Sequence, residues 1–326
     1  MSQRILVIKL SSLGDLFCAL PAVRMIKQGL NATIDWVTQA EYVDLVNCFE
    51  DVDRVIGFPR RNFLLHAGAY LHELRHERYD QVLDLQGLLK SALLVGRAAR
   101  AGRRIGPSNP REGARHFYND IAGPRNTRRH AVDELLDMVR RLGLDLTEPE
   151  FPVKFPSCKL KTTRPRVAFV PGSRWEAKNW TVEGFAHVGQ GLQAEKNATV
   201  YLVGGPADEV LCNGIAEKLD AERTENRAGC DTLIETGSLL REMDLVVSVD
   251  SGPMHMAVAC GVPVLAVFGA TDPRRTGPYG EGNRVIMAPE LADDPDLARA
   301  YRRRDTIGAW QVDQAEVARN ALEMLG

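Results

Sequence analysis

The sequence lacks the paired cysteines that a disulfide framework or a zinc site would need. Its 326 residues include six cysteines, and none of them belongs to a C-x-x-C pair. They are scattered through apolar segments, at Cys18, Cys48, Cys158, Cys212, Cys230 and Cys260. This distribution is typical of free, buried thiols in a reducing compartment.

No signal peptide opens the chain. The first apolar stretch, "RILVIKL" (4–10), is far shorter than the roughly 20 residues that a membrane span requires. We therefore expect a cytoplasmic protein.

A strong net charge is also missing. Lysine and arginine number 41 and aspartate and glutamate 43, which gives a formal net charge of -2. No global field favours nucleic acid, and we expect no nucleic-acid partner. The chain contains neither G-x-G-x-x-G nor G-x-x-x-x-G-K-[ST], which argues against a dinucleotide fingerprint and a P-loop.

One short stretch has the sequence pattern of a zinc site. "HELRH" (72–76) matches H-E-x-x-H, with His72 and His76 expected one helical turn apart. Its surroundings are highly charged, and no convincing third ligand follows. A solvated amphipathic helix is the better interpretation, and we expect no metal and no cofactor.

Short β-branched runs alternate with amphipathic stretches along the whole chain. Strands are predicted in the first half at 4–10, 33–38, 54–58 and 81–85, and in the second half at 166–170, 199–204, 245–249 and 262–268. Helices are predicted at 16–29, 41–48, 64–78, 88–101, 130–142, 181–195, 207–219, 253–260 and 313–325. Continuous apolar strands alternating with helices predict parallel sheets covered on both faces.

The alternation of predicted strands and helices begins again after a polar, basic segment at 155–166. The chain is also longer than one hydrophobic core usually supports. We therefore predict an α/β protein of two doubly wound domains, 1–157 and 158–326. The last helix is predicted to pack in the second domain or back on the first.

Ligands of open α/β sheets bind beyond the carboxyl ends of the strands, so the residues after each strand matter most. After the strand 245–249, Asp250 and Ser251 can cap a helix, and Gly252 lets a ligand approach the backbone. The helix start favours an anion, and His255 could donate to a phosphate oxygen. The alternative is a capped core helix with a satisfied histidine.

Small or polar residues also follow three other strands of the second half. Lys178 could neutralise a leaving diphosphate without a metal, although a solvated surface lysine is the alternative. The remaining candidates at these strand ends are Ser173, Gly204, Gly205 and Thr271. Together these strand ends predict a site for a nucleotide diphosphate.

The first half offers a carboxylate and several cations. In "SSLGDLFCALPA" (11–22), Gly14 would permit a tight turn, and Asp15 is either a helix N-cap or a general base. Arg60, Arg61 and the basic stretch that includes Lys90 and Arg111 could bind an anionic acceptor through bidentate contacts. Surface charge is the alternative for most of them.

Four ordered stretches carry a resemblance to a known family: "IKLSSLGDLFCALPA", "LDLQGLLKSALLVGRA", "PGSRWEAKNW" and "VSVDSGPMHMAVACGVPVLAVFGATDP". They resemble the bacterial ADP-heptose:lipopolysaccharide heptosyltransferases of glycosyltransferase family 9, and most closely the heptosyltransferase I type. The resemblance runs from Ile5 to about Tyr279. It implies a GT-B fold, in which two Rossmann-like domains face a central cleft, and an inverting, metal-independent transfer.

The resemblance also implies partners and roles. The second domain would bind a nucleotide sugar, ADP-heptose, and the first would bind the anionic lipid A–Kdo acceptor of lipopolysaccharide, with peripheral contact with the cytoplasmic face of the inner membrane. Asp15 matches the catalytic base and Lys178 the lysine near the diphosphate, while Asp250, Ser251, Gly252 and His255 match the donor-binding run. The acceptor-site candidates are Ser12, Gly14, Arg60, Arg61, Gln86, Lys90 and Arg111.

Two alternatives stay open at this point. One is a transferase of the same fold that uses a UDP- or GDP-hexose or an N-acetylhexosamine donor. The other is a nucleotide-sugar-binding protein without turnover. We place no motif of the family on the stretch 288–304.

Overall fold

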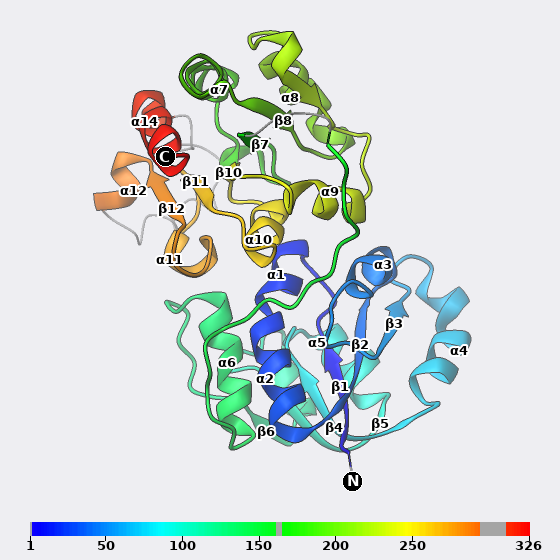
Figure 1. The fold of residues 1–326 in the computed structure, drawn as a ribbon. Helices are drawn as coiled ribbons and strands as arrows, with labels where there is room; N and C mark the ends of the chain where they lie inside the picture. Colours follow the sequence, from blue (N-terminus) through cyan, green and yellow to red (C-terminus); the bar gives the residue numbers. More distant parts are fainter. Residues whose placement is uncertain (1, 161–164, 294–310) are drawn as a thin grey trace. The chain divides into compact units, whose positions relative to one another are not determined.

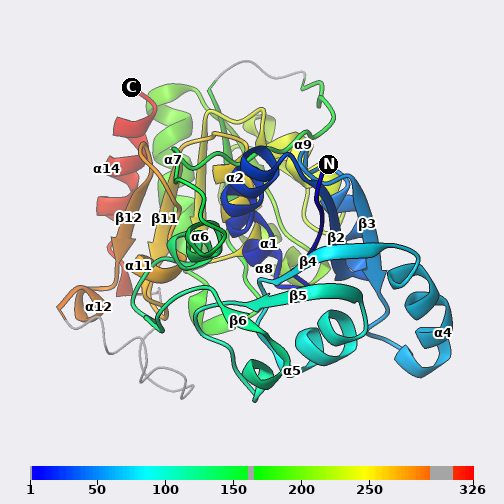
Figure 2. The ribbon, with the colours of Figure 1, turned by 90° about the horizontal axis from the view of Figure 1, so that it is seen from below.

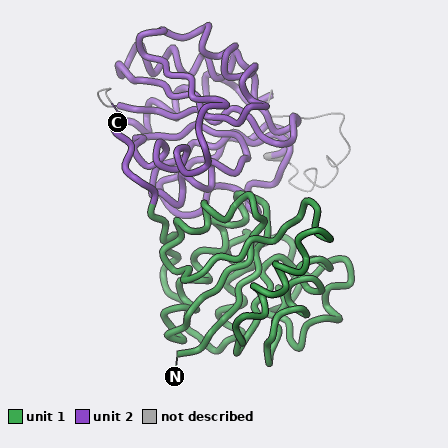
Figure 3. Tube along the Cα trace, turned by 90° about the vertical axis from the view of Figure 1, so that its right-hand side faces the viewer, with its two compact units in different colours: residues 1–154 green, residues 155–326 purple. Residues whose placement is uncertain are grey.

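The computed structural model describes residues 2–160, 165–293 and 311–326. Contacts along the chain divide it into two compact units, Met1–Lys154 (unit 1) and Phe155–Gly326 (unit 2), which Figure 3 colours separately. The sequence had suggested a boundary after residue 157 instead. Residues 161–164 of the polar segment and 294–304 of the stretch 288–304 lie outside the described residues.

Unit 1 is built on a six-stranded sheet in which all neighbours are parallel. Its strands are β1 (Arg4–Ile8), β2 (Thr33–Gln39), β3 (Arg54–Phe58), β4 (Arg78–Asp84), β5 (Arg100–Gly106) and β6 (Asp120–Ile121). They are ordered β3-β2-β1-β4-β5-β6 (Figure 1). The order reverses between β1 and β4, and this is the switch point at which doubly wound sheets bind ligands.

Helices cover both faces of this sheet. They are α1 (Leu13–Cys18), α2 (Leu20–Leu30), α3 (Val43–Val46), α4 (Phe63–Leu74), α5 (Leu89–Ser91) and α6 (Ala131–Arg141). Leu6 and Ile8 of β1 share a buried cluster with Tyr70 and Leu74 of α4. α2 and α6 pack against each other (Figure 1). Burial of β1 on both faces explains its continuous apolar sequence.

The helix predicted at 88–101 is only partly correct. α5 is followed by a π-helical segment, Ala92–Arg97, and β5 begins at Arg100. The sequence "RAGRRIG" hid β5, because its first half is rich in arginine and only its last three residues are fully buried.

Unit 2 repeats the same architecture. Its parallel strands are β7 (Arg166–Val170), β8 (Thr199–Leu202), β9 (Thr224–Asn226), β10 (Leu245–Val249), β11 (Val264–Phe268) and β12 (Arg284–Met287). Their order, β12-β11-β10-β7-β8-β9, reverses between β7 and β10. Read from the first strand of each unit, both sheets have the Rossmann order 3-2-1-4-5-6. The predicted α/β fold with two doubly wound sheets is confirmed.

The helices of unit 2 are α7 (Val182–Lys196), α8 (Glu209–Ala216), α9 (Leu233–Leu240), α10 (Gly252–Ala259), α11 (Pro273–Thr276), α12 (Pro289–Asp293) and α14 (Gln314–Met324). Val317 and Ala321 of α14 are buried in one cluster with Val188 and Leu192 of α7. Figure 2 shows the two helices side by side. The last helix therefore belongs to the core of unit 2, because its apolar side chains pack against α7.

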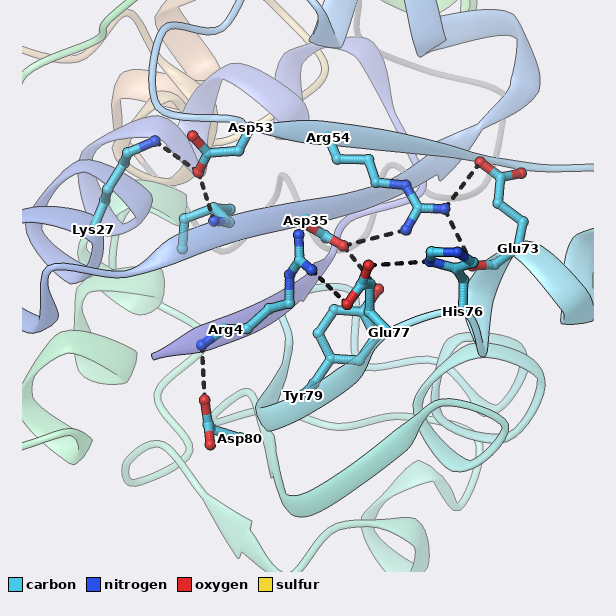
Figure 4. Close-up of polar contacts among 11 residues, drawn as sticks. Arg4, Lys27, Asp35, Asp53, Arg54, Glu73, His76, Glu77, Tyr79 and Asp80 are labelled. Atoms are coloured by element: carbon cyan, nitrogen blue, oxygen red, sulfur yellow. Dashed lines mark hydrogen bonds and ion pairs between the residues drawn. The ribbon is translucent and has the colours of Figure 1, made fainter. Parts of the chain in front are cut away.

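A buried carboxylate organises the amino ends of the unit 1 strands (Figure 4). Asp35 of β2 is fully buried, and its Oδ2 accepts a hydrogen bond of 2.9 Å from the Tyr79 hydroxyl. Guanidinium groups of Arg4 and Arg54 each lie 3.7 Å from this carboxylate. Burial raises the pKa of Asp35 above its usual range, and the hydroxyl and the two cations oppose that rise.

The "HELRH" segment belongs to this network (Figure 4). α4 ends at Leu74, so His76 lies beyond the helix, and the expected one-turn spacing of His72 and His76 is wrong. His76 Nδ1 lies 3.0 Å from Glu77 Oε1, and Glu73 Oε1 lies 3.6 Å from Arg54. Within the part of the chain that the structure describes, no three His, Cys, Asp or Glu side chains are arranged to hold a metal ion.

The described helices also include none with the length and continuous apolar character that a bilayer span requires.

Candidate functional site

The loop after β1 holds Asp15 in a defined position. Ser12 is the N-cap of α1, and Asp15 is its third helical residue. Asp15 Oδ2 accepts hydrogen bonds from the Ser12 backbone N–H at 2.9 Å and from the Ser12 hydroxyl at 2.6 Å. The Asp15 side chain remains 42% exposed. It is thus both anchored and accessible.

Two details of the sequence interpretation need correction here. Asp15 is not the N-cap, because a carboxylate at the third helical position reaches back to the N-cap N–H, as in a capping box. Gly14 makes no tight turn, since it is a buried residue within α1.

A buried lysine that the sequence did not single out lies next to Asp15. Lys9 Nζ donates to the carbonyl of Leu85 at 2.9 Å and lies 3.7 Å from Asp15 Oδ1. A buried ammonium needs such partners, and the neighbouring carboxylate balances its charge. A charged residue inside the apolar run "RILVIKL" could have indicated this role, but the strand pattern predicted Lys9 only as part of a strand.

The turn after β4 contacts the same loop. Gln86 Oε1 accepts hydrogen bonds from the backbone N–H groups of Leu10 at 2.9 Å and Ser11 at 3.0 Å. Arg111 joins this edge through its backbone N–H, which donates to the carbonyl of Gly87 at 2.8 Å. The structure thus brings Gln86 beside the loop of Ser12, Gly14 and Asp15.

The other predicted acceptor residues lie on other elements of unit 1. Arg60 and Arg61 are exposed and follow β3, two strands away from β1. Lys90, in α5, is partly buried.

In unit 2, one carboxylate oxygen accepts hydrogen bonds from the segments that follow two other strands. Asp250 follows β10 and is buried, and its Oδ2 accepts from Lys178 Nζ at 2.7 Å. The hydroxyls of Thr271 and Thr276 donate to the same oxygen at 2.6 and 3.3 Å. Lys178 follows β7, and both threonines follow β11. The predicted donor-site residues Lys178, Asp250 and Thr271 therefore lie together.

Thr276 was missed by the sequence interpretation. It ends the four-residue helix α11, and no local pattern links it to Asp250.

Helix α10 starts where the sequence placed an anion site. Ser251 is its N-cap, with Gly252 and Pro253 in the first turn, and Gly261 with φ of 73° follows its end. This geometry agrees with the start and stop signals in the sequence to within one residue. His255, also near the amino end, is 8% exposed. The helix start can favour an anion, as its backbone N–H groups point outward.

Two glycines, Gly172 after β7 and Gly204 after β8, leave room for the Asp208 side chain. A Cβ at Gly172 or Gly204 would lie 2.0 Å or 2.7 Å from atoms of the Asp208 side chain. Asp208 Oδ2 also accepts from the Gly205 N–H at 2.8 Å. The missing side chains therefore make room for Asp208, and contact between Gly204 or Gly205 and a donor stays a prediction.

Ser173 stabilises the loop that carries Lys178. Its N–H donates to Asn179 Oδ1 at 2.8 Å, and its hydroxyl donates to the carbonyl of Trp175 at 2.9 Å. The Lys178 ammonium lies 5.2 Å from the centre of the Trp175 ring.

The sequence pattern of "Glycosyltransferase family 9 (heptosyltransferase)" matches residues 68–305. The chain belongs to glycosyltransferase family 9. The family inferred from the sequence is confirmed, and this family 9 protein is a glycosyltransferase.

Curated relatives support the assignment along nearly the full length. The chain is 30% identical over 324 residues to lipopolysaccharide heptosyltransferase 1 of Pseudomonas aeruginosa, covering 93% of this chain and 89% of the relative. It is 26% identical over 297 residues to the lipopolysaccharide core heptosyltransferase OpsX of Haemophilus influenzae, covering 87% and 84%.

The structure of Escherichia coli heptosyltransferase WaaC with ADP aligns with a TM-score of 0.83 at 25% identity, covering 98% of this chain and 99% of WaaC. Both Rossmann-like units of the family 9 fold are thus present, as the GT-B expectation required.

The Lys178–Asp250 pair generates a stability prediction. Lys178→Met leaves the buried Asp250 carboxylate without its cation, a loss of about 3–5 kcal/mol in fully buried pairs and less here, because Lys178 is partly exposed. In Lys178→Met/Asp250→Asn the unpaired charge is gone, so we expect the double variant to be more stable than the single one. Urea unfolding of both variants measures this, and a double variant less stable than Lys178→Met contradicts the pairing.

Proposed function

We propose that this glycosyltransferase moves a heptose from ADP-heptose to the anionic inner core of lipopolysaccharide, with inversion and without a metal. One observation carries the proposal. Loops that follow different strands of unit 2 bring Lys178, Thr271 and Thr276 onto Asp250, directly before the amino end of α10. The names of the relatives, and the ADP in the WaaC structure, suggest the substrates.

The diphosphate of the donor is assigned to this part of unit 2. Asp250 orients the Lys178 ammonium, while His255 and the start of α10 supply further donors. Positive groups fixed in advance stabilise the charge that develops on the leaving diphosphate. They do so without a bound cation, so activity should survive a chelator. Ser173, Gly204, Gly205, Ser251 and Gly252 remain proposed donor contacts.

Asp15 is assigned as the general base. The acceptor oxygen attacks the anomeric carbon on the face opposite the diphosphate, the new C–O bond forms, and the bond to the diphosphate oxygen breaks. The hydroxyl proton passes to the Asp15 carboxylate, whose position is fixed by Ser12 and whose charge is balanced by Lys9. Attack from the opposite face inverts the configuration.

The base assignment predicts a selective loss of turnover. Asp15→Asn keeps the shape of the side chain but removes its basicity, so turnover should fall by roughly 10²–10⁴-fold. Donor affinity should change little, because the donor site is assigned to unit 2. Single-turnover rates and calorimetric titration with ADP measure the two effects. Near-normal turnover removes Asp15 from the mechanism.

The two sequence-based alternatives are tested by the donor itself. A panel of ADP-heptose and of UDP- and GDP-sugars separates a heptosyltransferase from a transferase of the same fold with another donor. Donor binding without product formation on any acceptor favours a non-catalytic binding protein.

Arg60 and Arg61 are assigned to the anionic acceptor. Charge-assisted contacts are typically worth about 1.5–3 kcal/mol, so Arg60→Ala/Arg61→Ala should raise the acceptor KM by at least about tenfold. Lysine replacements should recover only part of this loss, because an ammonium lacks the fork geometry. Rising salt should affect the parent more steeply than the double variant.

The matched control is Arg78→Ala/Arg100→Ala, since these arginines are also exposed but begin β4 and β5 at the other end of the sheet. Equal acceptor KM values for the two double variants contradict the assignment.

We assign the amino-terminal end of α4 to contact with the membrane surface that carries the acceptor. Leu64 is 92% and Leu65 78% exposed, and Arg60 and Arg61 precede them without an intervening acid. Adjacent exposed leucines beside basic residues suit the interface of an anionic bilayer.

Leu64→Ser/Leu65→Ser should therefore reduce binding to vesicles that contain an anionic lipid, measured by co-sedimentation. Val210→Ser is the control, because Val210 is 86% exposed on α8 of unit 2. Unchanged vesicle binding by the double variant contradicts the assignment.

A further inference from the structure

Two buried aspartates, each bonded to a tyrosine hydroxyl, lie at opposite ends of the unit 1 sheet; Tyr79 is buried and Tyr118 half-buried. Tyr79 donates to Asp35 at 2.9 Å near the amino ends of the strands (Figure 4). Tyr118 donates to Asp84 at 2.8 Å at the carboxyl ends, where Asp84 is the last residue of β4. In both pairs a tyrosine hydroxyl donates to an aspartate carboxylate. Only the Tyr118–Asp84 pair lies at the carboxyl ends of the strands, the edge that also carries Asp15.

Asp84 fixes the turn that follows β4. It is 1% exposed, and its Oδ1 accepts from the backbone N–H groups of Gln86 at 2.8 Å and Gly87 at 2.9 Å. Its Oδ2 accepts the Tyr118 hydroxyl. A buried carboxylate needs several donors, and these three hold the turn in one conformation. Gly87 adopts φ of 68° there, which a residue with a Cβ rarely does.

Tyr118 has little freedom to move. A Cβ at Gly106, the last residue of β5, would lie 2.2 Å from the Tyr118 ring, so the ring packs directly on that backbone. From this position the hydroxyl reaches the end of the neighbouring strand β4. A phenol held in this way gives its hydrogen bond a fixed direction.

The turn after β4 also fixes the segment that leads into α1 and Asp15. Gln86 Oε1 accepts from the backbone N–H groups of Leu10 and Ser11, the two residues before Ser12. Ser12 donates to Asp15 through its N–H and its hydroxyl. A continuous series of hydrogen bonds and one peptide segment therefore runs from Tyr118 to the carboxylate.

We propose that Tyr118 and Asp84 are positioning residues that hold, through Gln86, the loop presenting Asp15. The inference rests on the proposed role of Asp15 as the base. A base acts only within hydrogen-bond reach of the hydroxyl it deprotonates, and a displacement of about 1 Å can cost ~10²-fold in rate. In this role Gln86 uses its carbonyl for the protein backbone instead of the acceptor.

The test compares two variants with the same chemical change. Tyr118→Phe and Tyr79→Phe each remove one hydroxyl from a buried carboxylate, and both should lower the stability of unit 1. Only Tyr118→Phe should lower kcat, by between about tenfold and 100-fold, with the donor KM unchanged. If Tyr118→Phe and Tyr79→Phe give the same kcat at temperatures well below both Tm values, the inference is overturned.

A double-variant cycle with Asp15→Asn separates this inference from the proposed function. If Tyr118 acts through Asp15, Tyr118→Phe should change the rate of Asp15→Asn by less than about twofold. If the rate of the double variant instead falls by the product of the two single-variant losses, the inference is overturned. A near-normal rate for Asp15→Asn alone instead overturns the base assignment on which it rests.

Gln86→Met provides a second variant should Tyr118→Phe fail to fold. It removes the acceptor of the two N–H groups while keeping a similar side-chain length. It should lower kcat and show the same lack of additivity with Asp15→Asn. A rise in acceptor KM at unchanged kcat overturns the inference and assigns Gln86 to the acceptor instead.

Discussion

Parallel strands end at one common edge, and loops diverge where the strand order reverses. Both units are organised by this constraint. In unit 1 the reversal lies between β1 and β4, and the segments after these strands contain Asp15, in the first turn of α1, and Gln86. In unit 2 it lies between β7 and β10, and the loops after these strands contain Lys178 and Asp250. The polar side chains gather there because apolar residues fill most of the sheet interior.

Buried carboxylates illustrate how one chemical requirement serves different ends. Asp35, Asp84 and Asp250 are each nearly or fully buried, and each accepts at least one side-chain hydroxyl. Each burial would be costly without such donors. At Asp35 the further partners are arginines that begin strands, and the result is a stable sheet end. At Asp84 and Asp250 the further partners are loop backbone and a lysine, and the result is an ordered loop.

The sequence predicted best what depends on neighbouring residues. The strands β1, β7 and β10 were evident because each is a continuous apolar run, and α10 because its start and stop residues are local. The edge strands β6, of two residues, and β9, with the polar sequence "TEN", carry no such pattern. Lys9 was hidden in a strand pattern. Thr276 and Tyr118 act on Asp250 and Asp84, 26 and 34 residues away, and no local spacing reveals such contacts.

The placement of the last helix has a consequence for the history of such chains. Because α14 is buried against α7, unit 2 is continuous from Phe155 to Gly326, and unit 1 ends at Lys154. Each unit keeps a complete sheet and its own core on one uninterrupted stretch of the gene. A single recombination event near this junction can therefore exchange one unit for that of a relative without splitting a sheet. Under the proposed function the acceptor site lies on unit 1 and the donor site on unit 2, so each can diverge at its own rate.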